Sequence, residues 1–327
     1  MNIRGIAMQK TIMTAALVLS VLILATGCGT GLHNQNIDIS DPESSGLVAT
    51  PNDLAAFFNT SSSDTATLVA DINLETDMLL LTKERSKIVI NGNGHTIYGD
   101  AECVIRMDAG CTLVLNDVTV SGGTDAIGML GSGNIGGKNA NIHAVATGIN
   151  AIGSVCIERN SKIEVNTTVG YGIYAAGLEL DEYAELTVKN ESLSEEITGP
   201  NAITALSAPI IMGENSRLTA SSNEYNVIKC KNSFIMHDSS YLSVINTGEY
   251  HGAEIGALEI SGAVTIQAYG GEKGVGIFLV DLYDEIYVLG ECSPAPRHEN
   301  GRGSLNFVDQ LPEPTVEPSP ADIENGE

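Results

Sequence analysis

Short segments with alternating apolar and polar residues recur between residues 67 and 290. Every second residue of a segment is apolar, as in Leu113 and Leu115 or in Leu242 and Val244, and the intervening residues are mostly polar. This period of two is typical of a β-strand with one buried face, because successive side chains point to opposite sides of a strand. The segments do not show the 3.6-residue period of an amphipathic helix. The pattern therefore predicts many short strands.

The predicted strands recur with a loose period. The first inward apolar residues of successive segments are separated by roughly 20–25 residues, with a few longer gaps, which is the range of solenoid repeats. These residues are Leu68, Ile88, Leu113, Ile142, Ile163, Leu186, Leu218, Leu242, Val264 and Ile286. One repeat cannot bury its apolar face alone, so stacked parallel coils are expected.

Asparagine follows the first inward residue of several segments at a nearly constant distance. The positions are Asn91, Asn116, Asn166, Asn190 and Asn246. A side-chain amide both donates and accepts hydrogen bonds, so amides stacked along a solenoid can satisfy one another. Asparagine also tolerates the left-handed backbone of a sharp corner. We therefore expect a structural asparagine ladder; the alternative is that asparagine is simply common in loops.

Two stretches of sequence resemble a known family. IVINGNGHTIYG and VIRMDAGCTLVLNDVTVSGG look like the first coils of the right-handed parallel β-helix proteins of the pectate-lyase-like superfamily. The resemblance covers about residues 67–290. It implies an all-β, right-handed parallel β-helix of about ten coils in a single chain. Because this superfamily includes lyases, hydrolases, adhesins and non-catalytic binding proteins, the resemblance implies the fold more than an activity.

A short helix is predicted before the first coil, over residues 50–59. Asn52 or Asp53 is the expected cap, and Leu54, Phe57 and Phe58 have helical spacing. The helix would cover the open end of the first coil, where unpaired strand edges otherwise favour aggregation.

The N-terminus has the features of an exported lipoprotein. Arg4 and Lys10 provide a basic start, and residues 11–26 form an apolar run of signal-peptide length. The following LATGCG resembles a bacterial lipobox, which implies cleavage before Cys28 and lipidation of this cysteine. An ordinary secretory signal is the alternative. The resemblance places the protein in a bacterial cell envelope, anchored to the membrane by lipid and facing outward or into the periplasm.

These observations predict four parts of the chain. They are a signal peptide at 1–27, a flexible polar tether at 28–50, a β-helix domain at 51–310 and a Pro-rich acidic tail at 311–327. The tail is expected to remain disordered because its composition offers little to bury.

Charge restricts the possible partners. Lys and Arg number 16 against 41 Asp and Glu, which gives a formal net charge of −25. Such a surface repels nucleic acids and anionic membrane surfaces. We therefore expect no nucleic-acid partner, and contact with a membrane only through the lipid anchor.

Candidate catalytic residues are few. In the related lyases, an Arg or Lys base acts beside acidic calcium ligands, and the weak candidates here are Arg106 with Asp108, and Arg159. Isolated pairs of this kind are usually solvated surface contacts. His95, in the sequence NGH, is expected to belong to a turn. The sequence leaves catalysis undecided and favours a non-enzyme; if the protein is an enzyme, a polysaccharide lyase is expected.

Calcium is the one cofactor that the sequence suggests. Two acidic stretches contain Asp181 and Glu182, and Asp281, Asp284 and Glu285. Calcium requires several oxygen ligands, which such turns can supply. Solvated acidic corners are the alternative.

Sugar binding usually depends on aromatic platforms, and because the chain has no Trp, tyrosine is the expected platform here. Tyr183 and Tyr241 each come shortly before a predicted inward residue, so they could line one side of the solenoid. The alternative is that such rings stabilise neighbouring coils.

The leading hypothesis for function is a lipid-anchored surface β-helix that binds polysaccharide or another cell-surface glycan, or acts in adhesion, without catalysis. The first alternative is a calcium-dependent lyase of uronic-acid polymers. The second is a structural spacer of the envelope without a ligand.

Overall fold

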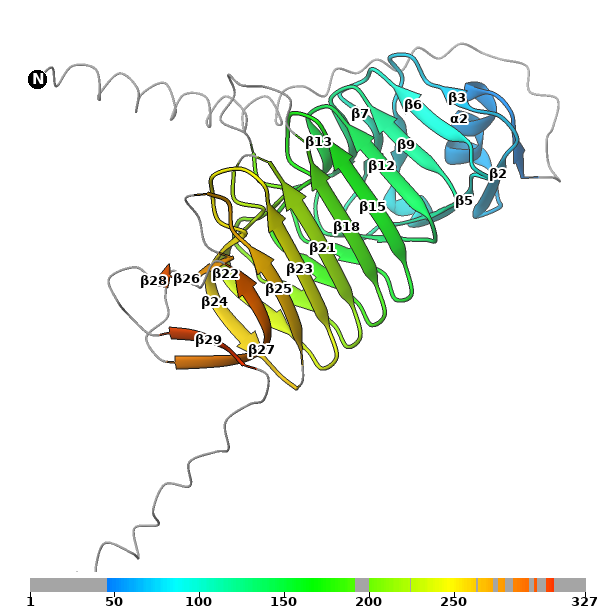
Figure 1. The fold of residues 1–327 in the computed structure, drawn as a ribbon. Helices are drawn as coiled ribbons and strands as arrows, with labels where there is room; N and C mark the ends of the chain where they lie inside the picture. The colour runs from blue at the N-terminus through cyan, green and yellow to red at the C-terminus, as the bar shows by residue number, and fades with distance from the viewer. Residues whose placement is uncertain are drawn as a thin grey trace, which may run out of the picture. The chain divides into compact units, whose positions relative to one another are not determined.

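The chain forms a parallel β-solenoid in the computed structural model (Figure 1). Every strand pairing in the described part of the chain is parallel, for example β10 with β13 and β15 with β18. The predicted all-β parallel β-helix is therefore confirmed, with about nine turns. The structure describes residues 46–191, 200–223, 225–262, 264–272 and 276–279, and the strand backbone alone at 285–293, 297–298 and 304–308.

Consecutive strands of one coil belong to three stacks, which we call sides A, B and C. Side A contains β1 (Leu47–Val48), β2 (Thr65–Leu68), β5 (Lys87–Asn91), β8 (Thr112–Asn116), β11 (Gly133–Gly136), β14 (Val155–Ile157), β17 (Leu178–Leu180) and β20 (Ile210–Met212). Side B contains β3 (Ile72–Asn73), β6 (Thr96–Gly99), β9 (Thr119–Gly122), β12 (Ala140–Ala144), β15 (Lys162–Thr167), β18 (Glu185–Asn190), β21 (Arg217–Ser222), β23 (Tyr241–Asn246), β25 (Thr265–Tyr269), β27 (Glu285–Ser293) and β29 (Ser304–Val308). Side C contains β4 (Leu79–Leu81), β7 (Cys103–Met107), β10 (Asp125–Met129), β13 (Thr147–Ala151), β16 (Ile173–Ala175), β19 (Ile203–Ala205), β26 (Ile277–Leu279) and β28 (Arg297–His298).

Two long strands connect sides C and A. β22 (Ile228–Met236) and β24 (Ala253–Ile260) run through the corner, with an irregular register between Cys230 and Ser233. Sides A and C consequently form one 18-stranded sheet, whereas side B is a separate 11-stranded sheet. The strands of side B lie next to one another across the front of Figure 1.

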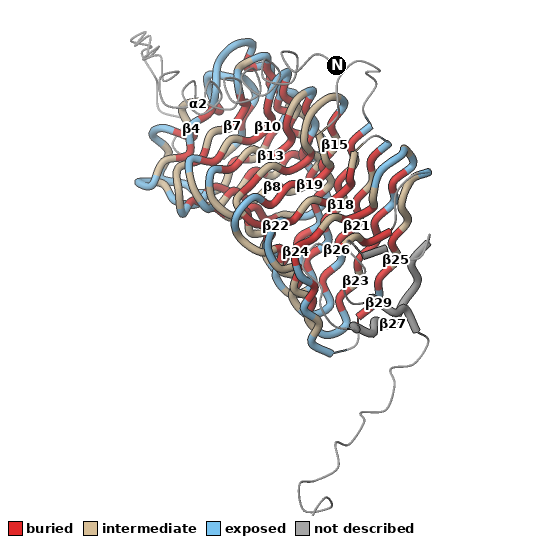
Figure 2. The backbone as a smooth tube through the Cα atoms, turned by 90° about the vertical axis from the view of Figure 1, so that its left-hand side faces the viewer, coloured by how far each residue is buried: buried red, intermediate tan, exposed pale blue. Residues whose placement is uncertain are grey.

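The core consists of aliphatic side chains that stack on their counterparts one coil away. In the side A row each residue pairs with the next: Ile88, Leu113, Ile135, Ile157, Leu180, Met212 and Met236. The side C row contains Ile105, Ile127, Ile149, Ile173, Ile203 and Ile228. These side chains are fully buried, and buried positions alternate with more exposed ones along each strand (Figure 2). The coils are therefore stabilised mainly by the burial of these rows.

The repeat positions predicted from the sequence do not all lie on one side. The first three lie on strands of side A, and the later ones lie on or beside strands of side B. Within side B, Ile142 pairs with Val165 rather than with Ile163. All three sides share the same alternation, so the period of two does not show which side a strand joins or which residues pair.

Helix α2 (Pro51–Thr60) begins one residue before the predicted caps. Thr50 is the N-cap, and its hydroxyl accepts a hydrogen bond from the Asp53 amide at 3.2 Å. The Asp53 carboxylate in turn accepts one from the Thr50 amide at 3.0 Å. This reciprocal capping box satisfies two amides that the first helical turn leaves free, so the cap is Thr50 and not Asn52 or Asp53.

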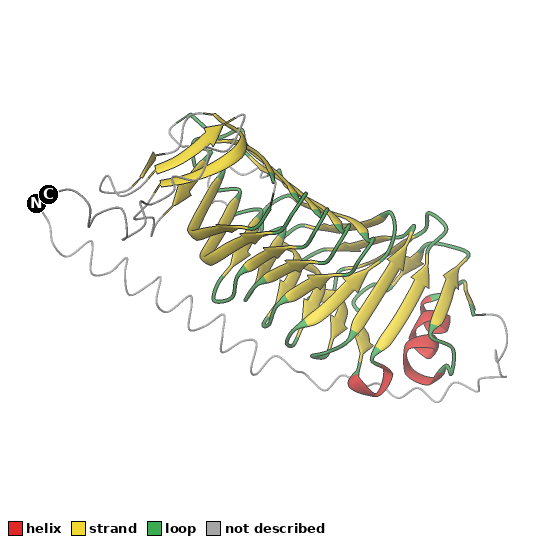
Figure 3. Cartoon of the chain, turned by 90° about the horizontal axis from the view of Figure 1, so that it is seen from below, coloured by secondary structure: helices red, strands yellow, loops and turns green. Residues whose placement is uncertain are grey.

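The predicted position of α2 beside the first coils is confirmed (Figure 3). Leu54, Phe57 and Phe58 are buried in the same core as the strands. Arg85, at the end of the 3₁₀ turn Lys83–Arg85, lies over the Phe57 ring with its Cζ 4.2 Å from the ring centroid. The helix therefore shields the first coils from solvent.

Several predicted parts lie outside the described residues. These are the signal peptide at 1–27, Cys28, the tether up to residue 45 and the tail at 311–327. Within the described ranges, no helix has the length and hydropathy needed to span a bilayer.

Asp125, at the start of β10, is an acidic side chain that the fold buries, with 9% of its surface exposed. Its carboxylate accepts a hydrogen bond from the Asn150 amide at 2.8 Å. Burial raises the pKa of this carboxyl above its ordinary value, and hydrogen bonds from Asn150 and Thr147 oppose the rise. Ionisation of Asp125 therefore opposes folding.

The stacked rows predict that the same substitution, isoleucine to alanine, lowers the free energy of unfolding by very different amounts at two nearby positions. Ile149 is fully buried in the side C row, whereas Ile152, three residues later, is 60% exposed. We expect Ile149→Ala to lower the free energy of unfolding by about 2–5 kcal/mol, because it leaves a cavity. Ile152→Ala should change it by less than about 0.5 kcal/mol. Urea denaturation of both variants measures this; equal losses would contradict the assigned burial.

Asp125 predicts a specific pH dependence. Its folded-state pKa lies above its unfolded value, so its favourable contribution is complete below the unfolded pKa and is lost as the pH rises through the folded pKa. The stability of the natural protein relative to Asp125→Asn should therefore fall as the pH rises above about 4, the unfolded-state pKa of an aspartate, toward neutral pH. Thermal unfolding of both proteins across this range tests it, and a difference that grows with pH would show that the sign is wrong.

Candidate functional site

The outer face of side B carries two rows of mainly neutral polar side chains, beside a third row that contains three charged residues: Lys162, Glu185, Arg217, Tyr241 and Thr265. Strand pairing aligns the first row one residue per coil: Thr96, Thr119, Asn141, Glu164, Thr187, Thr219, Ser243 and Gln267. Two residues further along the same strands, the second row contains Tyr98, Ser121, His143, Asn166, Lys189, Ser221, Ile245 and Tyr269. We call these two rows the polar face.

The polar face differs from the rest of the chain in its charge. Among these eight residues of the first row Glu164 is the only charged one, and the others carry hydroxyl or amide groups; the pairing of β25 with β27 continues the row to Glu291. In the second row Lys189 is the only side chain with a fixed charge. In a chain with a net charge of −25, these two rows therefore present mainly neutral hydrogen-bonding groups.

The two charged groups of the polar face neutralise each other. Lys189 Nζ lies 2.8 Å from Glu164 Oε1, and Asn166 Nδ2 donates a hydrogen bond to the same oxygen at 3.2 Å. The hydrogen bond from Lys189, followed by that from Asn166, lowers the pKa of Glu164, and partial burial opposes this. Glu164 is thus held ionised and its orientation is defined by two partners.

A depression of about 500 Å³ lies at the end of the polar face, toward the corner between sides B and C. It is lined mainly by polar side chains from neighbouring coils of side B. Its lining residues are Ser121, Gly122, His143, Ala144, Val145, Asn166, Thr167, Thr168, Lys189 and Glu191. We call this depression the groove.

Buried hydrogen bonds support the corner beside the groove. Asn190 Nδ2 donates to the carbonyl oxygens of Gly170 at 2.9 Å and Pro200 at 2.7 Å. Thr167, which pairs with Asn190 in the next coil, donates its hydroxyl to the same Gly170 oxygen at 3.2 Å. A Cβ atom at Gly170 would lie 1.6 Å from the Ala146 carbonyl oxygen, so only glycine allows this close approach. The groove therefore has a rigid border.

The candidate catalytic residues are not brought together. Arg106 lies on β7 of side C, and Asp108 follows that strand, with its carboxylate near the Lys83 amide at 3.4 Å. Arg159 lies at the corner between sides A and B, where it forms an ion pair with Glu182. Arg106 and Asp108 lie on side C and at its corner with side A, far along the coil from Arg159, and none of the three lines the groove.

The calcium candidates remain predictions. Glu182 pairs with Arg159, and the Asp181 side chain accepts a hydrogen bond from the Glu182 amide at 2.8 Å. The part of the chain that the structure describes contains no group of three or more His, Cys, Asp or Glu residues arranged to hold a metal ion. Asp281 and Asp284 lie outside the described residues, and only the backbone of Glu285 is described.

Tyr183 and Tyr241 both lie where strands of side B begin, but they do not occupy the same row. Tyr241 pairs with Arg217, whose Cζ lies 5.2 Å from the Tyr241 ring centroid. The Tyr241 hydroxyl also donates to Gln267 Oε1 at 2.7 Å. Tyr183 precedes β18 at the corner between sides A and B. The difference arises because Tyr241 is the first residue of β23, whereas Tyr183 lies in the turn two residues before β18.

The five asparagines do not form one continuous ladder. Asn116 Nδ2 donates to Asn91 Oδ1 at 3.0 Å, so this pair stacks as expected. Asn166, Asn190 and Asn246 belong to side B, where strand pairing places Asn166 next to Lys189 and not Asn190. Asn190 and Asn246 are buried, and each donates to one backbone carbonyl of its own coil and to one of the preceding coil. Their amides therefore satisfy backbone carbonyl groups at the corners. Recurring asparagines in the sequence are compatible with this role and with a ladder, so the sequence could not distinguish the two.

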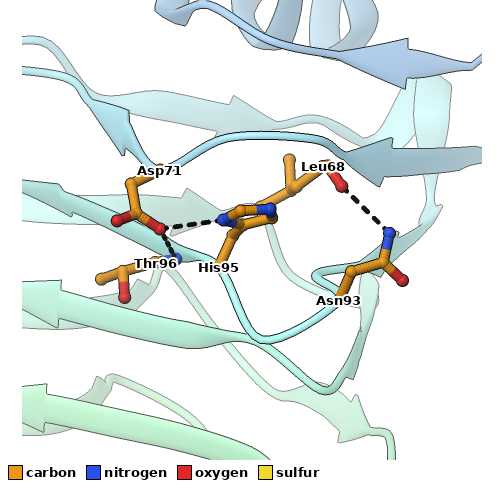
Figure 4. A network of polar contacts seen from close by, with 5 residues as sticks. All are labelled: Leu68, Asp71, Asn93, His95 and Thr96. Carbon is orange, nitrogen blue, oxygen red and sulfur yellow. Dashed lines mark hydrogen bonds and ion pairs between the residues drawn. The ribbon is translucent and has the colours of Figure 1, made fainter.

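His95 belongs to a turn, as predicted, and connects two coils (Figure 4). Its Nδ1 lies 3.1 Å from Asp71 Oδ1, which also accepts a hydrogen bond from the Thr96 amide at 2.9 Å. The Thr96 bond and then the His95 bond lower the pKa of Asp71. Asn93, with a φ of 51°, donates from Nδ2 to the Leu68 carbonyl oxygen at 3.1 Å.

The polar face is not evident from the sequence. Neither His143 nor Lys189 belongs to a recognisable motif, and the spacing of Asn166 indicates only the ladder. The available signal was the neutral polar character of the outward positions, as at Thr187 and Thr219. These outward residues form a row only when the strands are aligned in register, and the register is known only from the strand pairing.

Comparisons with known proteins add little. No protein-family model and no curated protein matches the chain. Among solved structures, L. reuteri 53608 SRRP is 14% identical, with a TM-score of 0.48, and L. reuters 100-23 SRRP is 14% identical, with a TM-score of 0.45. Each alignment covers 80% of this chain and 98% of the other chain. At this level of similarity neither match bears on function.

The Glu164–Lys189 pair predicts a small coupling that depends on pH and salt. Both side chains are about two-fifths exposed, so we expect a double-mutant cycle with Glu164→Gln and Lys189→Met to give a coupling of about 0.2–1 kcal/mol at neutral pH. Because the pKa of Glu164 is lowered, the coupling is present above the unfolded-state pKa and is lost as the pH falls through the folded-state pKa. Urea denaturation at pH 7 and pH 3 measures this. A coupling that persists at pH 3 would contradict the assignment.

Proposed function

We propose that this protein is a non-catalytic, lipid-anchored protein of a bacterial cell envelope that binds a neutral polysaccharide on its polar face. Adhesion to a surface that displays such a glycan is the corresponding role. The observation that supports the proposal is the pair of aligned, mainly neutral polar rows that lead into the groove.

The chemistry of the polar face suits a sugar. The hydroxyl groups of a glycan are both donors and acceptors, and the hydroxyl and amide side chains of the face can serve as both. These groups stand on strands whose backbone is fixed by pairing on both sides, so little conformational entropy is lost when a ligand binds. A repeating polymer can also contact the same row in several coils, which increases its overall affinity.

Charge favours a neutral glycan. The net charge of −25 repels polyanions such as uronic-acid chains at long range. The single lysine of the two rows is already paired with Glu164, so it does not offer a free positive charge to an anionic ligand. The calcium-dependent lyase and the structural spacer remain alternatives, and the following experiment distinguishes all three.

The test is retention of the purified ectodomain (residues 29–327) on insoluble cellulose, chitin, mannan and starch, with polygalacturonate and alginate in parallel, each with and without calcium. We expect retention on at least one neutral polymer without calcium. Asn166→Ala should reduce this affinity by about 3–10-fold, because it removes hydrogen bonds at the groove. Asn134→Ala, the same change on the outer face of side A, serves as the matched control and should have no effect.

The outcomes separate the alternatives. Retention on no polymer would reject the proposal and favour the spacer. New ultraviolet absorbance from unsaturated uronates, formed only with calcium, would favour the lyase. Equal losses in Asn166→Ala and Asn134→Ala would place the binding site elsewhere.

A further inference from the structure

Tyr183 occupies a backbone position that does not suit its side chain. Its φ is +59°, in the left-handed region, where bulky side chains are rare outliers. The corresponding corner residues of other coils are Asn160, Asn215 and Ser239, with φ values of 58°, 58° and 59°. Asparagine tolerates this conformation, so the corner itself does not explain a tyrosine.

Hydrogen bonds between coils establish that these corners are equivalent. The amide of Asn160 donates to the carbonyl oxygen of Glu182 at 3.2 Å, and the amide of Tyr183 donates to that of Glu214 at 3.1 Å. Each turn is also closed in the same way, as from the Ala184 amide to the Asp181 carbonyl oxygen at 3.1 Å. Tyr183 is therefore the third residue of a repeated turn, a position that favours Gly or Asn when φ is positive.

The contacts of the Tyr183 side chain with its own and neighbouring coils do not offset the strain of its left-handed backbone conformation. The Tyr183 side chain is 50% exposed, and its hydroxyl has no hydrogen-bond partner among the described residues. Arg159 Cζ lies 5.8 Å from the ring centroid, an exposed cation–π contact of modest strength.

A different aromatic pair illustrates how tyrosine rings stabilise neighbouring coils. The rings of Tyr225 and Tyr250, from adjacent coils, stack with centroids 4.6 Å apart and an interplanar angle of 8°. The described residues place no aromatic ring against Tyr183 in this way. The stabilising role that the sequence left open for tyrosine therefore applies to the stacked pair and not to Tyr183.

Tyr183 lies at the opposite end of β18 from the groove. Counting by alternate residues, the outward positions are Tyr183, Glu185, Thr187, Lys189 and Glu191, and the last two line the groove. Lys189 lies six positions after Tyr183, and the extended strand begins at Glu185, so the two residues are at most about 20 Å apart. Between them Thr187 belongs to the polar face. One extended ligand can therefore touch both ends.

We propose that Tyr183 is a sugar-stacking residue, and that the bound polysaccharide lies along β18 from the groove to this ring. The proposal rests on the proposed function and adds the direction and the minimum length of the ligand. An aromatic face packs against the apolar face of a sugar ring, so the stacking gained on binding offsets the backbone strain of the free protein. Oligosaccharides too short to span about 20 Å should bind through one end only and more weakly.

The experiment compares three variants of the ectodomain used in the retention assay. Tyr183→Asn should raise the Tm by about 2–4 °C, because asparagine relieves the strain at this corner. The same variant should bind the retained polysaccharide about tenfold more weakly. Tyr183→Phe keeps the ring and should bind like the natural protein. Tyr250→Asn, the matched control, removes a stacked ring and should lower the Tm without weakening binding.

Each result supports or rejects the inference. Undiminished binding by Tyr183→Asn, or affinity that does not increase with oligosaccharide length, overturns this inference and leaves the proposed function intact. A lower Tm for Tyr183→Asn shows that the ring is structural and also overturns it. Failure of the natural protein to bind any polymer of the panel rejects both proposals.

Discussion

The in-register stacking of inward aliphatic side chains is the constraint on which this fold depends. Each row, such as Ile127, Ile149 and Ile173 on side C, places a side chain directly against its counterpart one coil away. A shift of a strand by one residue would turn its apolar side chains toward solvent, so the buried rows fix the register of every strand. Once the inner positions are aligned, the outer positions are aligned as well.

The polar face is a consequence of this alignment. Thr187 and Thr219 lie side by side because Val188 and Ala220 are paired in the core beneath them. The face is therefore as rigid as the core that supports it, which is the property a binding surface needs to retain its affinity when the ligand is flexible. The strained backbone of Tyr183 is consistent with a rigid surface, because a strained residue persists only where the surrounding structure holds it in place.

Much of the architecture could be predicted from the sequence, and much of the candidate site could not. Alternation revealed the strands, the loose repeat revealed the solenoid, and the contact between Asn91 and Asn116 followed from their equal spacing. The groove escaped prediction because His143, Asn166 and Lys189 meet only through strand pairing. The single asparagine ladder failed for the same reason: equal spacing in the chain does not require equal position in a coil.

The sequence alone determined the class of fold, because a period of two with a loose long repeat can bury its apolar residues only by stacking coils. It also determined the presence of the first helix, whose apolar residues have helical spacing. Only the tertiary structure decided which side each strand joins and which outward residues share a row. The reason is that corners differ in length, as between β15 and β16 and between β18 and β19, so the position of a residue in its coil depends on how the chain turns and not on its distance along the sequence.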